Sequence, residues 1–197
     1  MVVDIFAEDL GHGEFLKALV NRLARQEGRV VVPRVRSARG GHGRALDELS
    51  LYQSSVQQGF GGLTVPDLLI VAIDTNCLSF NNAKRQVQAK LQAPFDDRTV
   101  VACPDPHIER WYLADPESFH DVVGVTPKVG RRKCERDRYK SILSKAVLDA
   151  GHPPTLGGIE FAREIVQAMD LYRAGKREPS LKHFLDDATA QIRVRQP

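Results

Sequence analysis

Acidic and amide side chains stand directly after apolar segments of this sequence, at the points where strands would end. They follow residues 2–7, 68–73 and 99–103, and they comprise Glu8, Asp9, Asp74, Asn76, Asp105 and Glu109. Carboxylate and amide oxygens suit a hard cation such as Mg²⁺ or Mn²⁺ better than zinc, which prefers His and Cys. These residue types therefore favour a magnesium or manganese site, provided that the fold brings them together.

A structural role explains each of these residues when it is considered alone. Asp74, Asn76 and Ser79 could form a turn and cap the next helix, and Asp105 could cap the helix after that. Glu8 could be an isolated surface acid. Because acids follow three different strands, a shared site is favoured over a separate structural role for each residue.

Four apolar, β-branched segments alternate with helical patterns in the first part of the chain. The segments are residues 2–7, 30–35, 68–73 and 99–103. This alternation predicts an α/β fold with a mostly parallel four-stranded sheet and flanking helices. Pro33 removes a backbone donor and places its strand at an edge, whereas the continuous apolar run 68–73 is typical of a central strand.

Parallel strands would bring the acids to one edge of the sheet, where ligands bind in open α/β folds. Two carboxylates about 4 Å apart repel by about 4 kcal/mol at an effective dielectric of about 20. A positive group is therefore expected between them.

Helical patterns replace the strands after residue 107, over residues 108–114, 139–147, 162–169 and 181–188. They predict an α/β core over residues 1–120 and a helical extension over residues 121–197, packed on the same domain. Trp111 and Tyr112 could stack on bases beside the site, although a core position in the first of these helices is the favoured interpretation.

Composition restricts the location and the redox chemistry of the protein. The 197 residues contain no apolar run long enough for a membrane span and no signal peptide, so a cytoplasmic protein without a membrane partner is expected. Cys77, Cys103 and Cys134 have neither the number nor the spacing of a disulfide framework or a zinc site. They are expected to be reduced thiols.

Two basic runs indicate a phosphate-bearing partner, although the net charge is only +3. Residues 29–44 contain five arginines and no acid, and residues 131–140 contain six basic residues against two acidic ones. Both runs could contact nucleic acid, and both could be solvated faces. The glycine turn over residues 39–44 could present backbone amides to a phosphate, but it lacks the P-loop pattern.

Other common catalytic motifs are missing from the sequence. The six histidines form no HExxH pair, and there is no G-x-S-x-G elbow of a serine hydrolase. Leu16 stands where a dinucleotide fingerprint beginning at Gly11 would need its third glycine.

Three segments of the first 120 residues resemble Toprim domains in order. Residues 6–19 resemble the first Toprim strand and helix, with a glutamate at the strand end, and residues 70–76 resemble the Asp-x-Asp strand. Residues 104–115 are similar to the "IEAWLLAD" segment of small Toprim-like proteins, some of them associated with bacterial phage defence. The glycine turn also has a counterpart in that group.

This resemblance implies a Rossmann-like Toprim fold and Mg²⁺- or Mn²⁺-dependent phosphodiester chemistry. Glu8, Asp74 and Glu109 would be the catalytic acids and, with Asn76, the metal ligands. Phosphate charge would be offset by basic residues: Arg39, His42, Arg44, Lys84 and Arg110. Two residues depart from the pattern, because Asp9 stands where the family often has Gly and Asn76 replaces a charged ligand.

The resemblance implies a small nuclease of the overcoming-lysogenization-defect type, acting on DNA or RNA in a defence or toxin role. The chain has no room for the extra domains of topoisomerases or primases. An ATPase or sensor partner and a homo-oligomer are further expectations. The alternatives are a non-catalytic interaction subunit with a degenerate metal site, and a nucleotide-binding domain that uses the glycine turn.

Overall fold

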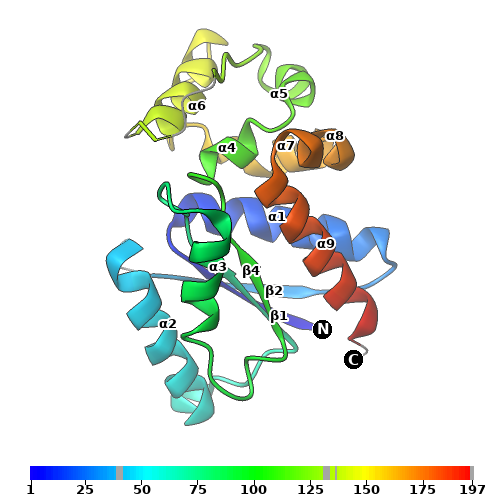
Figure 1. Cartoon of the computed structure of the whole chain (residues 1–197). Coiled ribbons are helices and arrows are strands. Elements are labelled where there is room, and N and C mark those ends of the chain that lie inside the picture. Colours follow the sequence, from blue (N-terminus) through cyan, green and yellow to red (C-terminus); the bar gives the residue numbers. More distant parts are fainter. Residues whose placement is uncertain (39–41, 131–133, 136, 196–197) are drawn as a thin grey trace.

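Four parallel strands form the sheet at the centre of the protein (Figure 1). The computed structural model describes residues 1–38, 42–130, 134–135 and 137–195. The strands are β1 (Val2–Ala7), β2 (Val32–Ser37), β3 (Leu68–Ala72) and β4 (Thr99–Ala102), in the order β2-β1-β3-β4. All neighbouring strands pair in parallel. The predicted Rossmann-like α/β fold with a four-stranded parallel sheet is confirmed.

The position of each strand follows from its sequence. β2 contains Pro33 and lies at an edge, paired with β1. β3 is buried along its whole length and lies between β1 and β4. The expected edge and central positions are therefore both correct.

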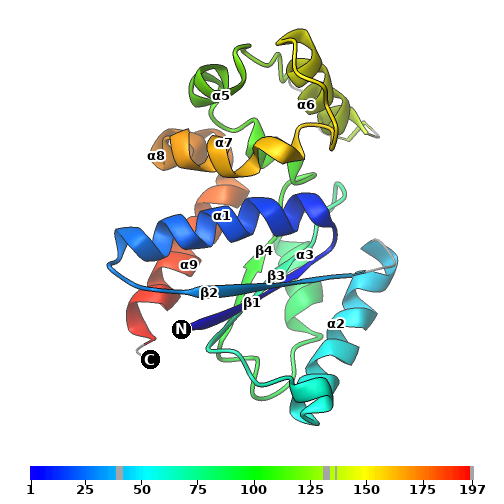
Figure 2. The same cartoon turned by 180° about the vertical axis from the view of Figure 1, so that it is seen from behind.

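Helices cover both faces of the sheet, because side chains alternate along each strand. Val3, Ile5 and Ala7 of β1 pack in one core with α1 (Leu10–Gln26) and α9 (Pro179–Val194). Phe6 points the other way, into a second core with α2 (His42–Gln57) and α3 (Phe80–Gln88). Figures 1 and 2 show these two layers on opposite sides of the strands.

The remaining helices follow β4 or lie in connections. The list is η1 (Phe60–Gly62), α4 (Glu109–Tyr112), α5 (Pro116–Val123), α6 (Arg138–Asp149), η2 (Ile159–Phe161), α7 (Ala162–Ala168) and α8 (Leu171–Arg177). The patterns had not indicated α5 and α8. In α8 the buried residues are Ala174 and Gly175, so the helix lacks the large apolar stripe that would reveal it.

Trp111 and Tyr112 belong to the core rather than to a base-stacking surface. Both side chains are fully buried. Trp111 Nε1 donates to Ser180 Oγ at 2.9 Å, and Tyr112 Oη donates to Gly11 O at 2.9 Å. These bonds attach α4 to α9 and to the first turn of α1.

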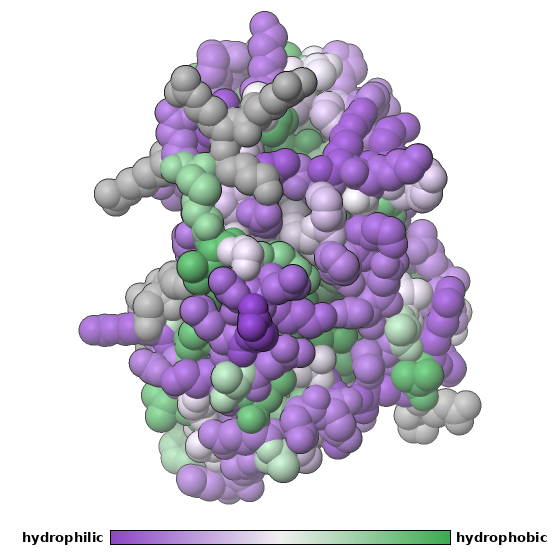
Figure 3. Space-filling model, in the orientation of Figure 1, coloured by the Kyte–Doolittle hydropathy of each residue, from purple (hydrophilic) through white to green (hydrophobic). Residues whose placement is uncertain are grey.

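The surface carries no extended apolar face in the view of Figure 1. Figure 3 shows that this face is mainly hydrophilic, with hydrophobic side chains in small separate groups. Among the described residues, none of the helices combines the length and the apolarity that a membrane crossing requires.

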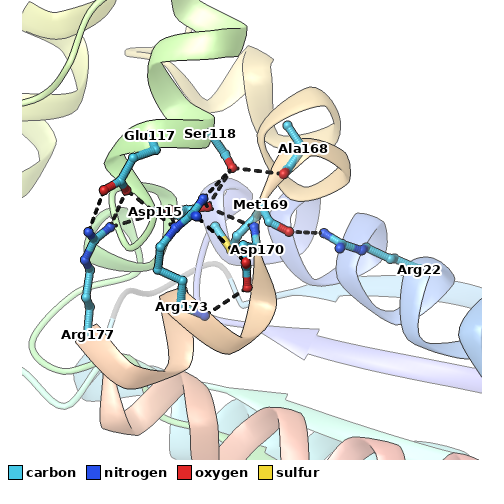
Figure 4. Close-up of polar contacts among 9 residues, drawn as sticks. All are labelled: Arg22, Asp115, Glu117, Ser118, Ala168, Met169, Asp170, Arg173 and Arg177. Carbon is cyan, nitrogen blue, oxygen red and sulfur yellow. Dashed lines mark hydrogen bonds and ion pairs between the residues drawn. The ribbon is translucent and has the colours of Figure 1, made fainter.

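A buried carboxylate ties the helices beyond β4 together (Figure 4). Asp115 has a fully buried side chain and binds Arg173 through Nε at 2.6 Å and Nη2 at 2.9 Å. It also accepts from Ser118 Oγ at 2.6 Å and from the backbone of Asp170 at 2.8 Å. Burial opposes ionisation, but these donors hold the pKa of Asp115 well below its usual value.

We expect Asp115→Asn to lower the free energy of unfolding by about 3 kcal/mol at neutral pH, because the arginine loses a buried, charged partner. The pKa of Asp115 is lower in the folded state than in the unfolded chain, where it is about 4. The stabilisation is therefore present above about pH 4 and is lost as the pH falls through the folded-state pKa. Urea denaturation at neutral and acidic pH measures the difference.

Asp186→Asn is the matched control, because its carboxylate pairs with Lys182 on the exposed surface of α9. Its effect should stay within about 0.5 kcal/mol. Equal stabilities of the two variants would show that the Asp115 network does not stabilise the fold.

Candidate metal and phosphate site

The carboxyl ends of β1 and β3 define the crevice in which the site lies. These strands are neighbours, but α1 covers one face of the sheet and α3 the other. Ligands bind at such a switch point in open α/β sheets. Glu8 follows β1, and its Oε2 accepts from the backbone N–H of Asp74, which follows β3, at 3.0 Å. The structure therefore brings these two predicted residues into contact.

The side chain of His12 lies fully buried between two carboxylates. Its Nδ1 lies 2.8 Å from Asp9 Oδ1, and its Nε2 lies 2.9 Å from Asp74 Oδ1. Burial alone would lower the pKa of His12, but the charges and hydrogen bonds of the two carboxylates raise it well above its usual value. The ring is therefore the positive group that the crowded acids require.

Asp9 positions this histidine through the start of α1. It is the N-cap residue, and its side chain accepts from the backbone N–H of His12 at 3.0 Å as well as from the ring. Burial raises the pKa of Asp9, but these contacts with His12 outweigh it and lower the pKa to about 2. Gly13 allows close packing here, because a Cβ would lie 2.9 Å from Val35 Cγ1 of β2.

A second imidazole contacts the other oxygen of Asp74. His107 Nδ1 lies 3.1 Å from Asp74 Oδ2. This hydrogen bond raises the pKa of His107 against partial burial. Burial opposes ionisation of Asp74, but the two histidines lower its pKa. Asp74 is thus held as a carboxylate in a fixed orientation.

An open pocket of about 450 Å³ lies beside Asp9, Asp74 and His107. Asp74, Asn76, His107 and Glu109 line it together with Lys140 of α6. Burial raises the pKa of Glu109, and the negative charges of Asp74 and Asp9 add to the rise. The pocket therefore gathers excess negative charge from several elements.

The loop after β3 has an unusual backbone at this pocket. Asn76 and Cys77 have φ values of 46° and 69°. Asn tolerates this left-handed region better than other residues, whereas Cys77 is held there at a cost of about 1–3 kcal/mol. Ser79 caps α3 with its side chain, as the structural alternative proposed. The loop after β3 therefore both caps α3, through Ser79, and lines the pocket, through Asn76 and Cys77.

The cysteines correct the expectation of three reduced thiols. Cys77 and Cys134 form a disulfide, and only Cys103 is a free, buried thiol. Both half-cystines line the pocket. The sequence separation of 57 residues gave no sign of the pairing, because the fold alone brings the segment before α6 to the loop after β3. The described part of the second basic run thus reaches the site through Lys140.

The predicted phosphate-binding side chains that the structure describes, those of Arg44, Lys84 and Arg110, do not line the pocket. Lys84 pairs with Asp187 of α9 at 3.0 Å, and Arg110 pairs with Glu178 at 2.5 Å. Both line other pockets, so their charges are used within the fold. Arg44 is exposed on the first turn of α2.

The glycine turn can be compared with the structure only in part. Arg39 and the glycines at positions 40 and 41 lie outside the described residues, as does the side chain of His42. The nucleotide-binding alternative that relies on this turn therefore stays a prediction.

The sequence analysis placed Asp9 among the acids that follow the strands, but it gave no role at the site to His12 or His107. One local signal was available for His12, because Asp9 directly precedes a helical pattern as a typical N-cap residue, and a residue three positions later lies within reach of its side chain. The contact between His12 and Asp74 spans 62 positions and had no sequence signal.

Glu8, His12 and Asp74 form a group of potential metal ligands whose atoms lie within 4.8 Å of one another. Both ring nitrogens of His12 already bind carboxylates, so the ring fits an orienting role better than a ligand role. The oxygen donors of Glu8, Asp74 and Glu109, with the amide of Asn76, suit a hard divalent cation. The residues present therefore fit Mg²⁺ or Mn²⁺.

Comparison with known proteins identifies one family. A family model described as a domain of unknown function (DUF4276) matches residues 7–187. Neither the curated proteins nor the solved structures gave a match.

We expect denatured protein to show one reactive thiol under non-reducing conditions and three after reduction, because Cys77 and Cys134 are paired. Titration with a thiol reagent counts them. In the control variant Cys103→Ala, the non-reduced count should fall to zero. Three reactive thiols before reduction would contradict the pairing.

Proposed function

Since the chain belongs to the family described as a domain of unknown function (DUF4276), we propose a function from the chemistry of its site: hydrolysis of nucleic-acid phosphodiester bonds with Mg²⁺ or Mn²⁺. The observation that carries this proposal is the position of Asp74 at the switch point of the sheet, where it contacts Glu8 and lines one pocket with Glu109. The Toprim resemblance of the same residues supports it.

Glu8, Asp74 and Glu109 would hold the cation, and Asn76 would supply a neutral oxygen. A bound divalent cation activates a water molecule and stabilises the charge of the leaving oxygen. Since Asn76 replaces a second carboxylate in the loop after β3, the set favours one cation over two.

The other residues of the pocket position these groups. His12 fixes Asp74 through Oδ1 and thereby orients its remaining lone pairs. His107 lines the pocket, and Asp74 holds its ring. Lys140 of α6 also lines the pocket. Both can donate hydrogen bonds to phosphate oxygens.

The setting of this activity is part of the proposal. A defence or toxin role and an ATPase or sensor partner follow from the Toprim resemblance alone, whereas the cytoplasmic location is the expectation from composition. The open and strongly polar pocket agrees with a large charged substrate rather than an apolar small molecule.

Specific observations also favour a second candidate, a non-catalytic subunit that binds without cutting. Asn76 removes one negative charge from the family pattern. Lys84 and Arg110 are committed to ion pairs within the fold. Metal binding without cleavage of any nucleic acid would support this candidate.

We expect wild-type protein to bind Mn²⁺ in calorimetric titration and to cleave nucleic acid only with added Mn²⁺ or Mg²⁺. Plasmid, single-stranded DNA and total tRNA are the substrates. Glu8→Gln and Asp74→Asn should each reduce cleavage by about 100-fold or more, because each removes a charged ligand.

Asp186→Asn serves again as the control, since it removes an exposed carboxylate of α9 that does not line the pocket. This variant should retain full cleavage. Circular dichroism confirms that each variant is folded. Undiminished metal binding and cleavage in both ligand variants would refute the nuclease proposal.

A further inference from the structure

A second, larger groove runs along α1, outside the carboxylate pocket. It has a volume of about 680 Å³ and is lined by residues of α1, of the turn before β2 and of α7. Four of its residues are basic: Lys17, Arg25, Arg29 and Arg163. Figure 2 shows α7 beside α1 in this region. We call it the α1–α7 groove.

The cations of the α1–α7 groove are not neutralised by carboxylates. Arg25 donates to the neutral amide of Gln167 at 2.6 Å, and Arg29 donates to a backbone carbonyl at 3.4 Å. Within the described residues, the side chains of Lys17 and Arg163 make no hydrogen bond or ion pair. Glu14 is the one acid in the lining.

An acid outside the lining that interacts with Arg29 is already engaged. The charge of Arg29 contributes to the lowered pKa of Glu27, but both oxygens of Glu27 bind Arg193, at 2.6 and 2.9 Å. On α1 itself, burial lowers the pKa of Arg22, and the charge of Arg25 lowers it further. The lining of the groove thus contains four basic side chains and one acidic one.

The spacing of these cations suits a repeating anion. Lys17, Asn21 and Arg25 are four residues apart and share one helix face. At a rise of 1.5 Å per residue, Lys17 and Arg25 are separated by about 12 Å, the length of three to four base-pair steps. Arginine also binds phosphate in a bidentate manner.

We propose that the α1–α7 groove binds the phosphodiester backbone of the substrate, outside the carboxylate pocket. This inference rests on the proposed nuclease function and deepens it. His12, which contacts Asp74, and Asn21, which lines the groove, are nine residues apart and therefore lie on opposite faces of α1. The groove would therefore hold a part of the substrate that lies outside the carboxylate pocket.

The test is fluorescence anisotropy with labelled duplex DNA, single-stranded DNA and RNA of equal length, in EDTA so that cleavage does not interfere. We expect Arg25→Gln/Arg163→Gln to weaken binding about tenfold and to reduce the slope of log K against log salt by about two. Lys17→Gln, which breaks no hydrogen bond, should reduce the slope by about one. The probe that binds most tightly distinguishes DNA from RNA.

Arg85→Gln/Lys145→Gln is the matched control, because it removes two exposed cations outside the groove. It should bind within about twofold of wild type. If Lys17→Gln and the groove double variant bind like this control while wild type cleaves, the groove inference fails and the nuclease proposal stands. If wild type binds none of the three probes and cleaves nothing, both fail.

Discussion

An imidazole ring enclosed between two carboxylates joins the start of α1 to the end of β3. His12 has no exposed side-chain surface, and each of its nitrogens contacts an aspartate. Removing one member of such a buried charged set leaves an uncompensated charge, which costs about 3–5 kcal/mol. The contact therefore restrains α1, the loop after β3 and the orientation of Asp74 together, and the carboxylate pocket depends on it.

The charges of the protein are distributed unevenly around this contact. Most buried acids outside the pocket are matched by cations, as Asp115 is by Arg173 and Glu178 is by Arg110. The pocket keeps an excess of acids, and the α1–α7 groove keeps an excess of cations. A polyanion would be attracted to the groove, and a divalent cation would be attracted to the pocket. The two surfaces are complementary parts of one proposed activity.

Local sequence patterns determined much of the fold. Apolar, β-branched runs specify the four strands, and the alternation with helical stripes specifies a parallel sheet. Pro33 specifies an edge, because it lacks a ladder donor. Parallel strands must present their carboxyl ends at one edge, so the meeting of Glu8 and Asp74 also followed from the sequence. The short helix α8 could not be predicted from the sequence, because its buried face consists of small residues.

By itself, the sequence determined which carboxylates lie at the end of the sheet, because the alternation of strands and helices along the chain predicts parallel strands. Only the tertiary structure decided which positive groups face them. His12 reaches Asp74 across 62 positions, Cys77 pairs with Cys134 across 57, and Lys84 and Arg110 turn to acids on or beside α9 instead of the pocket. Long charged side chains pair with the groups that lie near them in the folded molecule. Those distances depend on how the helices pack against one another, and the hydrophobic periodicity of the sequence does not determine this packing.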